Sequence, residues 1–134
     1  MTSHKNSGRN GLSHLIICVL FYRHVSSQHL LYLQLRRDIL EERCMADDQK
    51  LLSLSGLALH AEFGDYNRRT MGQNYFVPEQ YLPARVARRL GMGYVHDRAL
   101  EAHRDALGLA PSQCEIQFIK VGFSEVQFVL GGIL

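Results

Sequence analysis

The sequence has no tryptophan and is poor in proline and cysteine. Only three prolines occur in 134 residues, which favours helices over a fold rich in turns. The three cysteines are odd in number, far apart and without a Cys-x-x-Cys pair, so they indicate neither a disulfide framework nor a zinc site. Scattered thiols of this kind are typical of a reducing, cytosolic setting.

Excess charge of one sign and long apolar runs are also missing. The formal net charge of +2 is too small to indicate a nucleic-acid-binding protein. The most apolar run is LIICVLFY, at residues 15–22, and it falls well short of the ~20 residues that a helix needs to cross a bilayer. Its β-branched and aromatic residues predict a buried strand instead.

The motifs of common catalytic and metal sites are absent. There is no G-x-x-x-x-G-K-[ST], G-x-S-x-G, G-x-G-x-x-G or H-E-x-x-H in the sequence. His60 and Glu62 are two residues apart on a predicted helix and point to different sides, so we interpret His60 as a surface residue and Glu62 as solvated. His96 and His103 share a helix face, but no acidic residue is spaced to complete a metal site. We therefore expect no catalytic residue, no cofactor and no metal.

What the sequence does contain is helical periodicity. The first predicted helix lies in SSQHLLYLQLRRDILEERC, residues 26–44, where the leucines recur at helical spacing, and Ser26 or Ser27 can cap it. The second helix is predicted at 48–63, capped by Asp47 or Asp48 and ended by Gly64. Its apolar residues lie on most of its surface, which predicts a central helix. Gly56 in its middle predicts close packing against another helix, because a helical glycine is otherwise unfavourable.

Three further helices are predicted at 84–90, 94–107 and 112–121, after a loop that carries Pro78 and Pro83. Ser112 and Glu115 form a capping-box pattern at the start of the last one. The residues expected to face inward on the last two helices are Tyr94, Val95, Ala99, Ala102, Ala106, Ile116, Phe118 and Ile119. The fold class predicted is all-α, a bundle of four to five helices with a short unpaired N-terminal strand.

A basic cluster stands out on the helix at 84–90. Arg85, Arg88 and Arg89 are three and four residues apart, so they lie on one helix face. Two interpretations remain open for them. The first is an ordinary solvated face; the second is a contact with acidic lipid headgroups or an acidic protein, in which each basic residue contributes about 1 kcal/mol.

The segments LYLQLRRDILEER, AEFGDY and YFVPEQYLPARV resemble the central helical lobe of the FERM domain. Within that family, EQYLPARV looks most like the FERM domains of multi-PDZ non-receptor tyrosine phosphatases and FERM–PDZ scaffold proteins. The resemblance implies a helical bundle similar to acyl-CoA-binding protein, acting as a scaffold. It also implies that Arg88 falls at a position where a family member presents lysines to acidic membrane, with Arg85 and Arg89 as neighbours.

The resemblance divides the chain into four parts. Residues 1–14 are expected to be a disordered leader, and 15–22 a strand left from a preceding ubiquitin-like lobe. Residues 23–121 correspond to the central lobe, whereas 122–134 do not match the family. The chain therefore looks like a fragment of a FERM domain, with unpaired apolar strands that favour association.

The function implied is that of a non-catalytic scaffold at the cytoplasmic face of the plasma membrane. Its implied partners are the cytoplasmic tails of membrane proteins, an anionic phospholipid surface, the neighbouring FERM lobes and the cytoskeleton, but not nucleic acid. Two alternatives stay open. The chain is the regulatory domain of a non-receptor tyrosine phosphatase whose catalytic part is absent, or it is a small carrier that holds an acyl ligand between its helices.

Overall fold

The computed structural model describes residues 27–43 and 46–123, and every regular element among them is a helix. These elements are α2 (Gln28–Leu40), α3 (Asp48–Phe63), α4 (Arg68–Met71), the 3₁₀ helix η1 (Pro78–Gln80), α5 (Ala84–Leu90), α6 (Met92–Asp105) and α7 (Pro111–Gly122). The all-α prediction is confirmed for this part of the chain. The leader, the strand expected at 15–22 and most of the tail lie outside the described residues.

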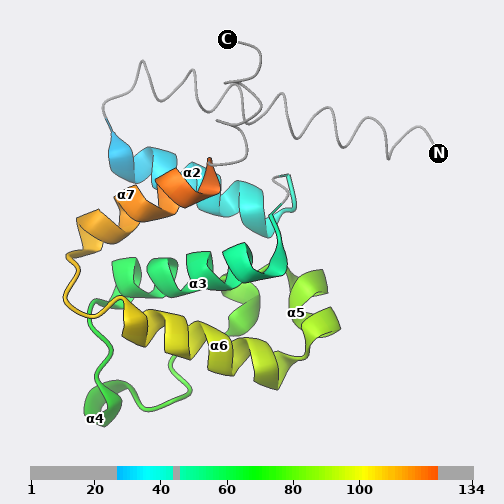
Figure 1. Cartoon of the computed structure of the whole chain (residues 1–134), viewed down its shortest axis with the longest axis vertical. Coiled ribbons are helices and arrows are strands. Elements are labelled where there is room, and N and C mark those ends of the chain that lie inside the picture. Colours follow the sequence, from blue (N-terminus) through cyan, green and yellow to red (C-terminus); the bar gives the residue numbers. More distant parts are fainter. Residues whose placement is uncertain (1–26, 44–45, 124–134) are drawn as a thin grey trace.

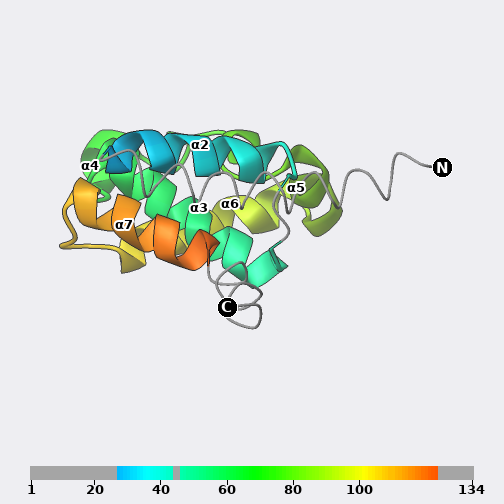
Figure 2. The same cartoon turned by 90° about the horizontal axis from the view of Figure 1, so that it is seen from above.

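Helix α3 occupies the centre of the bundle. Figure 1 shows it running between the α2–α7 pair and α6, and Figure 2 shows α2 and α7 lying side by side across it. All residues from Leu54 to His60 are buried, because α6 and α7 cover α3 on opposite sides. The central position predicted from the wide apolar surface of this helix is therefore confirmed.

Local signals set several helix ends. The Ser27 hydroxyl accepts from the Leu30 N–H at 3.3 Å, and the Asp47 carboxylate accepts from the Lys50 N–H at 2.7 Å, so both predicted caps are present. Gly64 follows α3 with a φ of +75°, a conformation that glycine adopts without a side-chain clash.

The predicted capping box of the last helix is wrong. Helix α7 begins at Pro111, whose fixed φ suits the first helical position, so Ser112 already lies inside the helix. The side chain of Gln113 instead accepts from the Ala110 N–H at 2.8 Å. Glu115 reaches across to α2, where it pairs with His29 at 2.7 Å.

Helix number and orientation also differ in part from the prediction. The segment expected to be a plain loop contains α4, a single turn capped by the side chain of Asn67, which accepts from the Arg69 N–H at 3.0 Å. Tyr94 and Ile116, both expected to face inward, are 47% and 38% exposed. Their helices instead turn Val95 and Phe118 toward α3, because the core lies on that side.

Helices α3 and α6 approach each other closely at Gly56. A Cβ atom built on Gly56 would lie 2.3 Å from the Cβ of Ala102 and 2.6 Å from its carbonyl carbon. Real Cβ atoms do not approach a backbone this closely, so only glycine lets the two helices pack at this distance. The close packing predicted from this glycine is confirmed.

Two buried imidazoles, those of His60 and His103, lie near the C-terminal end of α3 and hold the loops that follow α3 and α6. His103 Nε2 lies 2.7 Å from the carbonyl oxygen of Gly64, so it donates its proton there, and its Nδ1 accepts from the Tyr75 hydroxyl. His60 Nε2 donates in the same way to the carbonyl oxygen of Leu109 at 2.7 Å. The two rings pack edge to face, with centroids 5.5 Å apart.

The prediction that His60 lies on the surface is wrong, since its side chain is completely buried. The i, i+2 spacing does separate it from Glu62, whose side chain is 46% exposed as predicted, whereas His60 points toward His103 of α6 and is enclosed there. Burial lowers the pKa of His103, and the nearby His60 lowers it further against the opposing effect of the Gly64 carbonyl. The imidazole of His103 therefore favours its neutral form in the fold.

We expect Gly56→Ala to lower the free energy of unfolding by about 1–3 kcal/mol, because the added methyl group overpacks the α3–α6 contact. Gly93→Ala is the matched control: a Cβ there meets nothing within 4 Å, so better helix propensity should stabilise the protein by about 0.5–1 kcal/mol. Urea denaturation followed by circular dichroism measures both. Equal effects of the two substitutions would contradict the packing argument.

We expect stability to fall as the pH drops below about 6.5, because the unfolded His103 gains a proton there while the folded one resists protonation. His103→Gln keeps a donor for the Gly64 carbonyl but does not titrate. The variant should be less stable than the wild type at pH 7.5 and should lose less stability between pH 7.5 and 5.5. Urea denaturation of both proteins at both pH values gives the change in the free energy of unfolding with pH. An identical change in the two proteins would rule out a role for His103.

Candidate functional site

The residues first considered for catalysis form structural contacts instead. Glu62 accepts a hydrogen bond from the Tyr81 hydroxyl and lies 3.6 Å from Arg36, which donates to the carbonyl oxygen of Gln80 at 3.2 Å. The guanidinium of Arg36 also stacks over the Tyr81 ring at 4.5 Å. These contacts join α2, α3 and η1, and so fix the turn that leads into α5.

Burial and the hydrogen bond to Glu62 raise the pKa of Tyr81, so its hydroxyl stays protonated and donates. No group of three or more His, Cys, Asp or Glu side chains in residues 27–43 and 46–123 is arranged to hold a metal ion.

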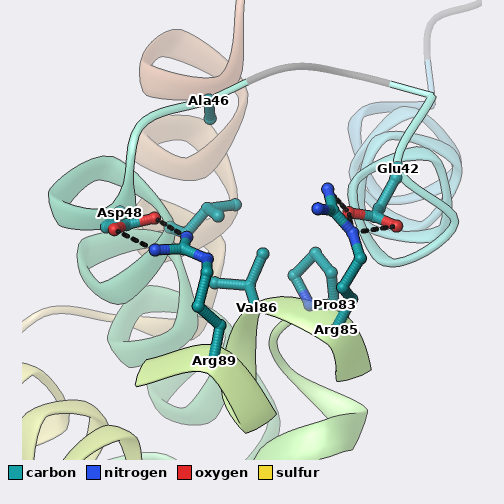
Figure 3. A pocket seen from close by; sticks show the side chains of 8 residues that line it. Glu42, Ala46, Asp48, Pro83, Arg85, Val86 and Arg89 are labelled. Carbon is teal, nitrogen blue, oxygen red and sulfur yellow. Dashed lines mark hydrogen bonds and ion pairs between the residues drawn. The ribbon is translucent and has the colours of Figure 1, made fainter.

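Arg85 and Arg89 of the basic cluster border a small pocket at the N-terminal end of α3. The pocket has a volume of about 170 Å³ and lies where α5 meets the end of α2 and the start of α3 (Figure 3). Pro83 and Val86 lie between its two charged sides, and Ala46 faces them. The complete lining is Glu42, Ala46, Asp48, Leu51, Pro83, Arg85, Val86 and Arg89.

Two ion pairs form the sides of this pocket. The guanidinium of Arg85 donates from Nη2 and Nε to Glu42 Oε1 at 2.7 and 3.1 Å. That of Arg89 donates to Asp48 Oδ1 at 2.8 Å. Each pair joins segments about forty residues apart in sequence, and the hydrogen bond with Glu42 raises the pKa of Arg85.

The three arginines share the exposed face of α5, as their spacing predicts, but their surroundings differ. The side chains of Arg85 and Arg89 remain 75% and 54% exposed despite their ion pairs. Arg88 is exposed as well and has no hydrogen bond or ion pair with any other residue that the structure describes. The cluster therefore contains one uncompensated guanidinium and two that carboxylates already hold.

Sequence reasoning missed Glu42 and Asp48 as parts of this site. Helical spacing brings the arginines together, but the two carboxylates come from the end of α2 and the start of α3. Glu42 also has a φ of +58°, in the left-handed region where the first residue beyond a helix is usually glycine. No pattern within the α5 segment signals either contact.

Comparison with known proteins gives the family of this fold. The FERM central domain matches residues 19–122. Human tyrosine-protein phosphatase non-receptor type 13 is 43% identical over 103 residues, which cover 77% of this chain and 4% of that protein. Mouse FERM and PDZ domain-containing protein 2 is 42% identical over 102 residues, covering 74% of this chain and 7% of that protein.

A more distant relative is human Merlin, 26% identical over 97 residues, which cover 71% of this chain and 16% of that protein. This chain thus spans only a small part of the length of these relatives. In the described segments, no helix combines the length and the apolar character needed to cross a membrane. The match confirms what LYLQLRRDILEER and AEFGDY indicated: the chain belongs to the family of FERM central domains.

Proposed function

We propose that this chain is a non-catalytic interaction module that docks on the cytoplasmic face of the plasma membrane. In this role it binds an anionic phospholipid surface and the cytoplasmic tails of membrane proteins, and connects them with other FERM lobes and the cytoskeleton. The observation that carries the proposal is the exposed face of α5, where Arg85, Arg88 and Arg89 lie together on a family scaffold.

The size of the pocket favours docking on a surface over enclosure of a ligand. Sites that enclose a drug-sized ligand measure roughly 300–1,000 Å³, whereas this pocket holds about 170 Å³ and has charged sides. A carrier of acyl chains needs a larger and apolar cavity, which this pocket does not supply. An exposed helix with three arginines suits a flat anionic layer, where each basic residue that no carboxylate compensates adds about 1 kcal/mol to binding.

A second candidate is the regulatory domain of a non-receptor tyrosine phosphatase. It is favoured by the 43% identity with human tyrosine-protein phosphatase non-receptor type 13. The role proposed for the α5 face is the same in both candidates, because the regulatory domain would also act by docking. Sequencing the full transcript on both sides of this coding region distinguishes them.

We expect Arg88→Glu to weaken binding to vesicles of phosphatidylcholine and phosphatidylserine by about thirtyfold at low salt, since two units of charge change at about 1 kcal/mol each. Arg88 has no partner among the described residues, so this substitution breaks no ion pair. Vesicle co-sedimentation measures the dissociation constant.

The matched control is Arg68→Glu, which changes the net charge equally at an exposed arginine of α4, away from the pocket. It should weaken binding much less. Unchanged binding of Arg88→Glu at low salt, or equal losses in both variants, would remove the assignment of the α5 face.

A further inference from the structure

We infer that Glu42 and Asp48 compete with anionic lipid for Arg85 and Arg89, and so set the density of anionic lipid at which the chain binds. This inference rests on the proposed function, because it concerns the same face of α5. It assigns a role to two acidic residues that stand beside a surface proposed to bind anions.

The geometry of the ion pairs carries the first step. Arg85 presents Nε and Nη2 together to one carboxylate, and Arg89 presents both terminal nitrogens to Asp48, at 2.8 and 3.4 Å. A guanidinium binds a phosphate in a bidentate way, through the same pairs of N–H donors that it uses for a carboxylate. The carboxylate and a lipid phosphate are therefore alternative partners of each arginine.

The exposure of the arginines carries the second step. Both side chains remain more than half exposed, so a lipid phosphate can reach them from solvent without opening the fold. Exposed ion pairs are weak because water screens them. A dense layer of phosphate groups can therefore displace the carboxylates, whereas a sparse layer meets mainly Arg88.

The backbone at Glu42 provides an independent observation. Its φ of +58° is unfavourable for a residue with a side chain, and glycine is the usual choice just beyond a helix. Local backbone preference therefore does not explain the glutamate at this position. Its carboxylate, however, reaches Arg85 across the pocket (Figure 3).

Asp48 is likewise not needed as the cap of its helix. The capping hydrogen bond of α3 comes from Asp47, which accepts from the Lys50 N–H. Asp48 lies one residue later and directs its carboxylate to Arg89. With both carboxylates in place, the five charged groups sum to +1, and the loss of either carboxylate by substitution raises this sum to +2.

The test measures binding to phosphatidylcholine vesicles that contain increasing fractions of phosphatidylserine. Glu42→Gln should bind about fivefold more tightly than the wild type at low phosphatidylserine, the effect of one uncompensated arginine. The gain should shrink as the phosphatidylserine fraction rises, because the wild type then releases the arginine itself. Asp48→Asn should behave in the same way through Arg89.

The control for net charge is Glu101→Gln, which removes an acid that is paired with Arg98 on α6. It should change binding by less than about twofold. Glu42→Gly is the second variant at the main position, since glycine accepts the left-handed backbone and secures folding. Both Glu42 variants should bind alike, which separates the loss of the carboxylate from any change in the fold.

A double-mutant cycle decides whether the effect passes through the ion pair. The gain from Glu42→Gln should vanish when Arg85 is Gln, because no guanidinium remains to be released. A gain that persists without Arg85, or is equal to that of Glu101→Gln, would overturn the inference. If the Arg88→Glu variant instead binds vesicles as tightly as the wild type does, the proposed function itself is rejected.

Discussion

The enclosure of α3 is the constraint on which the rest of the structure depends. Because Gly56 has no side chain, the backbone of α6 lies directly against α3 near Ala102. That contact lies near the C-terminal end of α6 and helps to orient this helix against α3. One end carries His103 to the loops beyond Gly64, and the other holds α5 next to the start of α3. Two polar assemblies, the imidazole pair and the ion pairs of the pocket, thus depend on how neighbouring helices pack against α3.

These two assemblies have different physical characters. The imidazole pair is buried, and each ring donates to a backbone carbonyl, so replacing either ring by an apolar side chain removes a hydrogen bond inside the fold. The ion pairs on α5 are exposed, and water or another anion can replace either partner. The buried assembly therefore specifies the fold, whereas the exposed one is free to exchange partners.

Sequence patterns predicted the features that depend on neighbours along the chain. Ser27, Asp47 and Gly64 act at helix ends through contacts within a few residues, so local rules found them. Whether His60 is buried depends on how much of the α3 surface the neighbouring helices cover, and the periodicity of the sequence does not give this. Ile116 shows the reverse error, since an apolar residue at a helical spacing still faces solvent when the core lies elsewhere.

The same limit decides what a basic cluster means. Spacing places three arginines on one helix face, and by that count the surface is strongly cationic. Folding then brings Glu42 and Asp48 to two of them from segments about forty residues away. The field that an anionic partner meets is the sum of these charges, not of the arginines alone. A charge pattern in sequence therefore gives an upper bound on attraction, and the tertiary contacts determine how much of it is available.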